Sequence, residues 1–104
     1  MRVRNITSTS ENKCSCGSWL DHWKKFARIT LNTCSVQGCT GTDLVGGHVL
    51  KESTSDQSWY IVPLCVDCNN QRGQALDIRD NVTLVSANVA ETCEKGGLIN
   101  SARR

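Results

Sequence analysis

Two pairs of cysteines carry the clearest chemistry in this sequence. Four residues separate Cys34 from Cys39, and two separate Cys65 from Cys68. Such short spacings let the turn inside each pair direct both sulfur atoms at one ion, and four thiolates form a closed tetrahedral site for Zn²⁺. The same residues also fit two disulfides or four buried thiols. We favour structural zinc, because seven cysteines in a chain without a visible secretory signal are typical of a reducing compartment.

The composition gives this metal a structural purpose. The chain has 104 residues, of which 38% are hydrophobic and 5% aromatic, so it forms one domain with a thin core. Structural zinc contributes on the order of 10–16 kcal/mol of apparent binding free energy to folding. That amount is comparable with the whole stability of an ordinary domain. Removal of the metal is therefore expected to unfold the protein.

A helix is predicted over residues 18–28, ahead of the first cysteine pair. Trp19, Trp23 and Phe26 recur at helical spacing and form one apolar face. Ser18 is a suitable N-cap, because its hydroxyl can accept a hydrogen bond from a backbone N–H of the first turn. The tryptophans of this face are expected in the core rather than stacked on nucleic acid bases.

A β-hairpin and a short helix are predicted between and after the cysteine pairs. Residues 44–50 and 59–62 are strand candidates joined by a polar run, and Pro63 is expected to end the second strand. A helix then begins at the second cysteine pair and ends near Gln71, and residues 82–89 form a last strand. Knuckle, hairpin and helix, in this order, predict an α+β class: a small zinc-stabilised treble-clef, ββα-metal-like domain with an N-terminal helix.

Residues 34–73 also carry the pattern of a known family. The matching pieces are Cys34 with Cys39, then Gly47-His48-Val49, then Pro63-Leu64-Cys65-Val66-Asp67-Cys68-Asn69. In this order they resemble the zinc-containing form of the HNH (His-Asn-His) endonuclease superfamily. The predicted organisation is a polar arm over residues 1–13, one zinc-binding HNH-like domain over residues 14–93, and a polar tail over residues 94–104.

The resemblance implies roles for two residues of a catalytic centre. His48 would be the general base that activates water, and Asn69 would help to bind a catalytic Mg²⁺ or Mn²⁺ ion. The chain departs from the family pattern at two positions: Gly47 stands where a metal-binding Asp or His is expected, and Tyr60 stands near the expected middle Asn. Because Mg²⁺ prefers several oxygen ligands in octahedral geometry, a lone Asn would hold it poorly.

His48 therefore has three interpretations. It is a surviving general base, a residue at or next to a zinc site, or an ordinary histidine at a strand end. If catalysis survives, Asp43 or Asp67 would have to replace the missing metal ligand. We expect a degraded catalytic centre.

A second set of metal-ligating residues lies outside this segment. Cys14 and Cys16 precede the predicted helix, His22 lies within it, and Cys93 follows the last predicted strand. Three thiolates and one imidazole would complete a second, closed zinc site. The alternatives are reduced buried cysteines, a disulfide from Cys93 to Cys14 or Cys16, and a packed core histidine. The sequence thus predicts one zinc ion, or two.

The charge pattern gives a mild indication of a polyanionic partner, because the formal net charge is only +2. The positive residues are clustered: Arg2 and Arg4, then Lys24, Lys25 and Arg28, then Arg103 and Arg104. Such clusters are also common on solvated surfaces. No stretch of the sequence is long and apolar enough to cross a bilayer, and no membrane partner is expected.

We therefore expect a cytoplasmic binding module that recognises DNA or RNA, or a protein that processes nucleic acid. Its size and family resemblance suit a phage or bacterial accessory protein, including an inhibitor of a nuclease. One alternative is an active metal-dependent endonuclease with His48 as general base. Another is an adaptor that makes no contact with nucleic acid.

Overall fold

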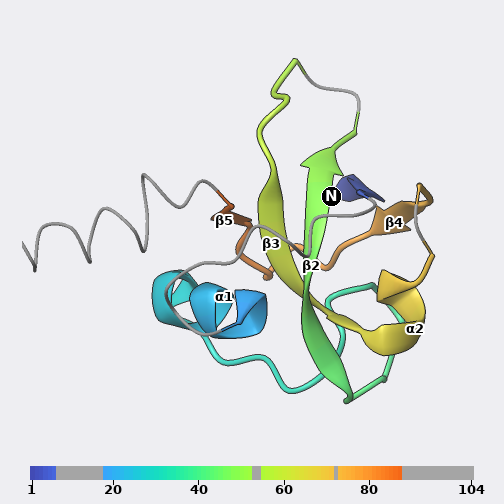
Figure 1. The fold of residues 1–104 in the computed structure, drawn as a ribbon. Coiled ribbons are helices and arrows are strands. Elements are labelled where there is room, and N and C mark those ends of the chain that lie inside the picture. The colour runs from blue at the N-terminus through green and yellow to red at the C-terminus, as the bar shows by residue number, and fades with distance from the viewer. Residues whose placement is uncertain (7–17, 53–54, 72, 88–104) are drawn as a thin grey trace, which may run out of the picture.

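A five-stranded antiparallel sheet and two helices form the described part of the chain, which comprises residues 1–6, 18–52, 55–71 and 73–87 of the computed structural model (Figure 1). The elements are β1 (Arg2–Asn5), α1 (Trp19–Ala27), β2 (Leu44–Lys51), β3 (Tyr60–Cys65), α2 (Val66–Asn69), β4 (Ala75–Asp77) and β5 (Val85–Ser86). The strand order is β4-β1-β2-β3-β5. This architecture confirms the predicted α+β class. Neither helix is long and apolar enough to cross a membrane.

The hairpin of β2 and β3 is the centre of the sheet, as predicted. Its pairing runs from Leu44 opposite Cys65 to Val49 opposite Tyr60. The expectation that Pro63 ends the second strand is wrong, because β3 continues to Cys65. The Pro63 carbonyl accepts a hydrogen bond from the backbone N–H of Ser35 at 2.9 Å, so it faces away from β2. The N–H that proline lacks would point to this same side, so the pairing of β3 with β2 loses no hydrogen bond.

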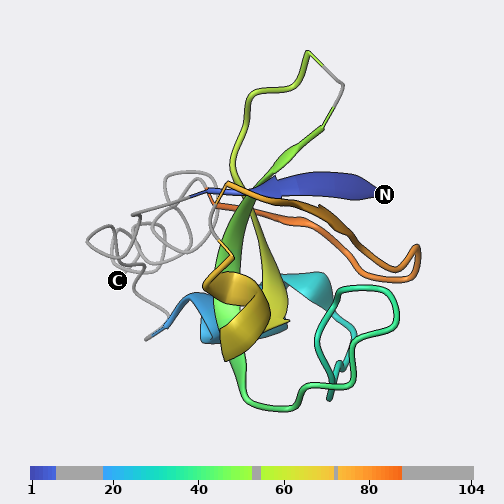
Figure 2. The same cartoon turned by 90° about the vertical axis from the view of Figure 1, so that its right-hand side faces the viewer.

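Two consecutive glycines in β2 let a helix approach each face of the hairpin. A Cβ atom at Gly46 would lie 2.5 Å from the backbone of Trp19, at the start of α1. A Cβ atom at Gly47 would lie 2.4 Å from the side chain of Leu64 and 3.2 Å from the Asn69 side-chain oxygen, on the α2 side. Figures 1 and 2 show α1 and α2 on opposite sides of the hairpin. Only glycine leaves room for both contacts.

Helix α1 follows the prediction closely. Ser18 is its N-cap, and the Ser18 hydroxyl accepts a hydrogen bond from the Asp21 backbone N–H at 3.0 Å. Trp23 is almost fully buried, and its indole N–H donates to the Thr83 carbonyl at 2.8 Å. The apolar face of α1 therefore packs on the sheet, and Trp23 also fixes the segment that leads into β5.

The first residues of the chain depart from the predicted polar arm. Residues 2–5 form β1, which pairs with both β2 and β4 inside the sheet. Val3 and Asn5 are buried, whereas Arg2 and Arg4 are exposed. The sequence did not predict this strand because one of its two buried side chains is polar. With Val3 as its single buried apolar residue, β1 shows no alternation of apolar and polar residues. Residues 7–13 of the predicted arm and the whole predicted tail over 94–104 lie outside the described residues.

The C-terminal strands differ from the prediction of one strand over residues 82–89. β4 was not predicted, and β5 occupies two residues of the strand expected over 82–89, whose last two positions are not described. The core lies between the sheet and α1, and it continues to the segment that follows α2. Its buried apolar side chains include Val3, Trp23, Val49, Ile61, Leu64, Ile78 and Val85.

Candidate metal centre

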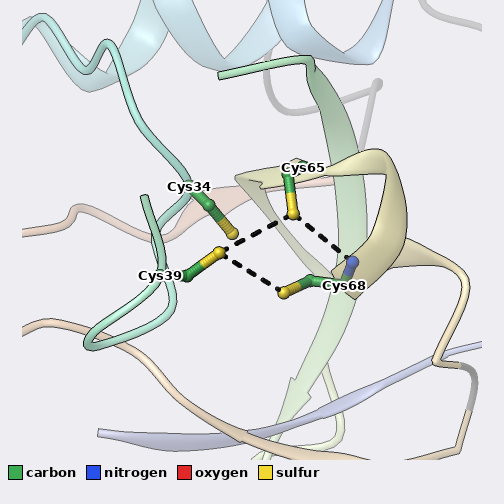
Figure 3. A group of neighbouring side chains, drawn as sticks. All are labelled: Cys34, Cys39, Cys65 and Cys68. Carbon is green, nitrogen blue, oxygen red and sulfur yellow. Dashed lines mark hydrogen bonds between the residues drawn. The ribbon is translucent and has the colours of Figure 1, made fainter. Parts of the chain in front are cut away.

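The four predicted zinc ligands come together from two segments. Cys34 and Cys39 lie on the loop between α1 and β2, whereas Cys65 ends β3 and Cys68 lies in α2. Cys65 is also the N-cap of α2, and its sulfur accepts a hydrogen bond from the Cys68 backbone N–H at 3.5 Å. Figure 3 shows the four sulfur atoms directed toward one another. The strand-to-helix junction thus supplies one ligand pair and the loop the other.

The distances between these sulfur atoms fit a tetrahedral metal site. All four Sγ atoms lie within 4.8 Å of one another. The Cys39 sulfur is 3.8 Å from the Cys65 sulfur and 3.9 Å from the Cys68 sulfur. A tetrahedron with Zn–S bonds of about 2.3 Å has edges of about 3.8 Å. The four cysteines are free thiols rather than disulfide partners, and the cluster could hold a metal ion such as zinc.

The loop that carries the first pair is shaped by glycines and backbone hydrogen bonds. Gly38 has a φ of +83°, a left-handed conformation that glycine adopts without steric cost in this tight turn. The Cys34 backbone N–H donates to the Gly41 carbonyl at 2.8 Å, which closes the loop. A Cβ atom at Gly41 would lie 2.6 Å from the Cβ and 2.9 Å from the Sγ of Cys65. Gly41 thus lets the loop pack directly against the second cysteine pair.

The thiols differ in their tendency to ionise. Burial raises the pKa of Cys34 and the pKa of Cys68. A hydrogen bond from the Gly41 backbone lowers the pKa of Cys39. A bound cation overrides such differences, because a coordinating thiol is deprotonated outright. The cluster is therefore suited to a divalent metal that converts all four thiols to thiolates.

Two residues that no motif singled out stabilise the cluster. The Asn5 side-chain amide donates to the carbonyls of Cys68, Asn69 and Gln71 at 3.2, 2.8 and 3.1 Å. These carbonyls lie at and just beyond the C-terminal end of α2. Two of them also accept a backbone N–H: the Cys68 carbonyl from Gln71 at 3.1 Å, and the Gln71 carbonyl from Gln74 at 3.3 Å. Arg79 donates to the Thr33 hydroxyl at 3.0 Å and to the Cys34 carbonyl. Both contacts join distant parts of the chain, so nothing in the local sequence indicates them.

The two predicted catalytic residues are not brought together. His48 lies on the face of β2 that meets α1, with its ring centroid 4.6 Å from that of Trp19. Asn69 lies on the opposite face, beside Gly47. His48 is only 5% exposed, and burial lowers its pKa from 6.5 to about 4. A regular strand directs successive side chains to opposite faces, which accounts for this separation.

Of the second predicted set, only His22 belongs to the described residues. Cys14, Cys16 and Cys93 lie outside them. His22 is fully buried on α1, and its Nε2 atom lies 2.8 Å from the Ser86 carbonyl oxygen. Protein-family models, curated proteins and solved structures give no match to the chain, so the HNH resemblance stays a prediction.

Proposed function

We propose that the protein is a zinc-stabilised, HNH-like module of the treble-clef type that has lost its catalytic centre and binds nucleic acid. The thiol cluster supports the zinc ion, and the order of loop, hairpin and helix around it supports the treble clef. The zinc is structural, because four cysteine ligands leave no open coordination position for chemistry.

The separation of His48 from Asn69 is the main observation that supports the proposed loss of catalysis. A general base and the metal ion must meet at one water molecule, whereas these side chains occupy opposite faces of the hairpin. A buried imidazole with a pKa of about 4 is also a weak base at neutral pH. Gly47 supplies no ligand on the Asn69 side. The remaining frame is suited to binding rather than cleavage.

The exposed side of α1 is the surface best suited to a polyanion. On the sheet, Arg2 pairs with Asp77 at 3.0 Å and Arg4 pairs with Glu52 at 2.7 Å, so these cations are already neutralised. The basic residues of α1 and its C-cap are exposed and form no ion pair with any described residue. They are Lys24, Lys25 and Arg28. Phosphate binding depends on such available cations.

Salt-dependent binding tests this surface. Fluorescence anisotropy with labelled single-stranded and double-stranded oligonucleotides is measured across a salt series. For the duplex, replacement of Lys24 and Lys25 by Gln should reduce the slope of log affinity against log salt by about 2, since each phosphate contact contributes about 0.9. The matched control is Lys51→Gln, because Lys51 is already paired with Asp56 at 3.5 Å. If neither the single-stranded nor the double-stranded oligonucleotide binds, the proposal of nucleic-acid binding is refuted and a protein partner is favoured.

A nuclease assay tests the loss of catalysis separately. The metal-loaded protein and a His48→Ala variant are incubated with supercoiled DNA and Mg²⁺ or Mn²⁺. We expect no nicking by either protein. Nicking by the wild type that disappears in the variant would establish the alternative, an active endonuclease with His48 as general base.

A chelator experiment tests the metal itself. Because the core is thin, zinc removal should abolish the cooperative thermal transition followed by circular dichroism, and added zinc should restore it. A transition unchanged by a strong chelator would show that the cluster has no structural role as a metal site.

A further inference from the structure

Trp59 presents a large aromatic side chain to solvent immediately before β3. It is 41% exposed, whereas Trp23 is almost fully buried and Trp19 is half-buried against the hairpin. A single exposed apolar side chain is common on protein surfaces, so exposure alone assigns it no role. The contacts around Trp59, however, hold this exposed ring in one orientation.

The indole of Trp59 is supported by a buried ring and by the residues on both sides of it in the chain. It meets the His48 ring in a T-shaped contact, with centroids 6.1 Å apart and planes at 82°. The Asp56 carboxylate accepts hydrogen bonds from the Ser58 backbone N–H at 2.9 Å and from the Tyr60 hydroxyl at 2.6 Å. Both residues that flank Trp59 are therefore tied to one carboxylate. A side chain that is already ordered loses little conformational entropy when it binds a partner.

Trp59 lies on the same side of the hairpin as the basic residues of α1. The His48 ring contacts both Trp59 and Trp19, and Trp19 is the first residue of α1. The short helix α2, on the opposite side of the hairpin, contains one acidic residue and no basic residue. The exposed aromatic ring and the available cations thus share one side of the molecule. These cations are Lys24, Lys25 and Arg28.

An ordered aromatic ring on a basic side of the molecule fits an unpaired base better than a paired one. The bases of a single strand can stack on an aromatic side chain while their phosphates contact Lys and Arg. A base in a duplex must first leave its stack, which costs free energy. The Asp56 carboxylate beside Trp59 is paired with Lys51 at 3.5 Å, so it repels a polyanion only weakly. We propose, on the basis of the nucleic-acid binding proposed above, that Trp59 stacks on an unpaired base and makes the module prefer single strands to duplexes.

Two substitutions of Trp59 separate stacking from a general apolar contact. Fluorescence anisotropy measures the affinity of each variant for a labelled DNA single strand and for the duplex of the same sequence. Trp59→Leu should weaken single-strand binding about 5-fold to 150-fold, as expected for the loss of one stacked base, and should leave duplex binding unchanged. Trp59→Phe keeps an aromatic face and should keep most of the single-strand affinity. The matched control is Val66→Ala, which truncates an exposed apolar side chain on α2 and should change neither affinity.

Photocrosslinking of the wild type gives a second readout that needs no variant to fold. A DNA single strand that carries 5-iodouracil is irradiated with the protein, and mass spectrometry locates the modified residue, which should be Trp59. Crosslinks confined to other residues would overturn the proposal. So would a Trp59→Leu variant that binds the single strand as tightly as the wild type, or one that weakens single-strand and duplex binding equally. If the wild type binds no oligonucleotide at all, nucleic-acid binding itself is refuted, and the role of Trp59 with it.

Discussion

Substitution of Gly41 by alanine should damage the metal cluster through one methyl group. The added Cβ would lie 2.6 Å from the Cβ of Cys65, and carbon atoms at ordinary contact are about 3.6 Å apart. Either the loop or Cys65 must therefore move by about 1 Å, whereas metal–ligand distances tolerate about 0.2 Å. The backbone of Gly41 is not in the left-handed region, so the penalty arises from space alone.

The expected loss of zinc affinity is large enough to measure directly. Changes next to a metal site typically cost 10-fold to 100-fold in affinity, and displacement of a ligand should reach at least the upper end, about 2.8 kcal/mol. Competition with a chromophoric chelator gives the dissociation constant. The control is Gly38→Asn in the same loop, because asparagine tolerates a positive φ and no atom lies within 4 Å of the new Cβ. Equal zinc affinity in Gly41→Ala and wild type would refute the close packing of the Gly41 loop against Cys65.

Three further predictions concern the surroundings of the site. Asn5→Ala should lower the free energy of unfolding in urea at saturating zinc by about 1–3 kcal/mol, because the Asn69 carbonyl loses its side-chain donor and the carbonyls of Cys68 and Gln71 keep only backbone donors; a smaller loss would contradict this role. The pKa of His48 is about 4 when folded and 6.5 when unfolded, so the unfolded state binds more protons between these values and acidification destabilises the protein. Between pH 7 and pH 5.5 the free energy of unfolding of the wild type should fall by about 1 kcal/mol more than that of His48→Gln. Equal decreases would exclude a buried neutral imidazole. Gly47→Asp should destabilise the fold by about 1–3 kcal/mol without creating nicking activity, because the new side chain overlaps Leu64; nicking by this variant would show that the two faces of β2 cooperate.

The parts of the fold that the sequence predicts are those with local signals. Cysteine spacing identifies all four members of the cluster, and helical spacing of Trp19, Trp23 and Phe26 identifies α1. The hairpin follows from two apolar runs. Each signal arises from residues close together in the chain, where periodicity or spacing expresses a single physical requirement.

The remainder depends on contacts between distant residues. β1 pairs with β2 and β4 across most of the chain, and half of its buried side chains are polar. The Asn5 side chain forms its hydrogen bonds only when the carbonyls at the end of α2 lie beside it. β3 can continue through Pro63 because this residue faces the backbone N–H of Ser35 on the side away from β2. No β-strand of the described residues pairs with Pro63 on that side, so no partner strand needs the N–H that proline lacks. None of these partners is visible before the chain is folded.

The glycine pair of β2 explains why His48 and Asn69, to which the family resemblance assigns catalytic roles, lie on opposite faces of the hairpin. Gly46 admits the first turn of α1 against one face, and Trp19 then covers His48. Gly47 admits Leu64 and Asn69 against the other face, in the space that a metal-binding side chain would need. Close helix packing and an open catalytic cleft compete for the same two positions. Cys65 ends β3 and Cys68 lies in α2, so an ion held by the four-cysteine cluster would fasten α2 to the hairpin.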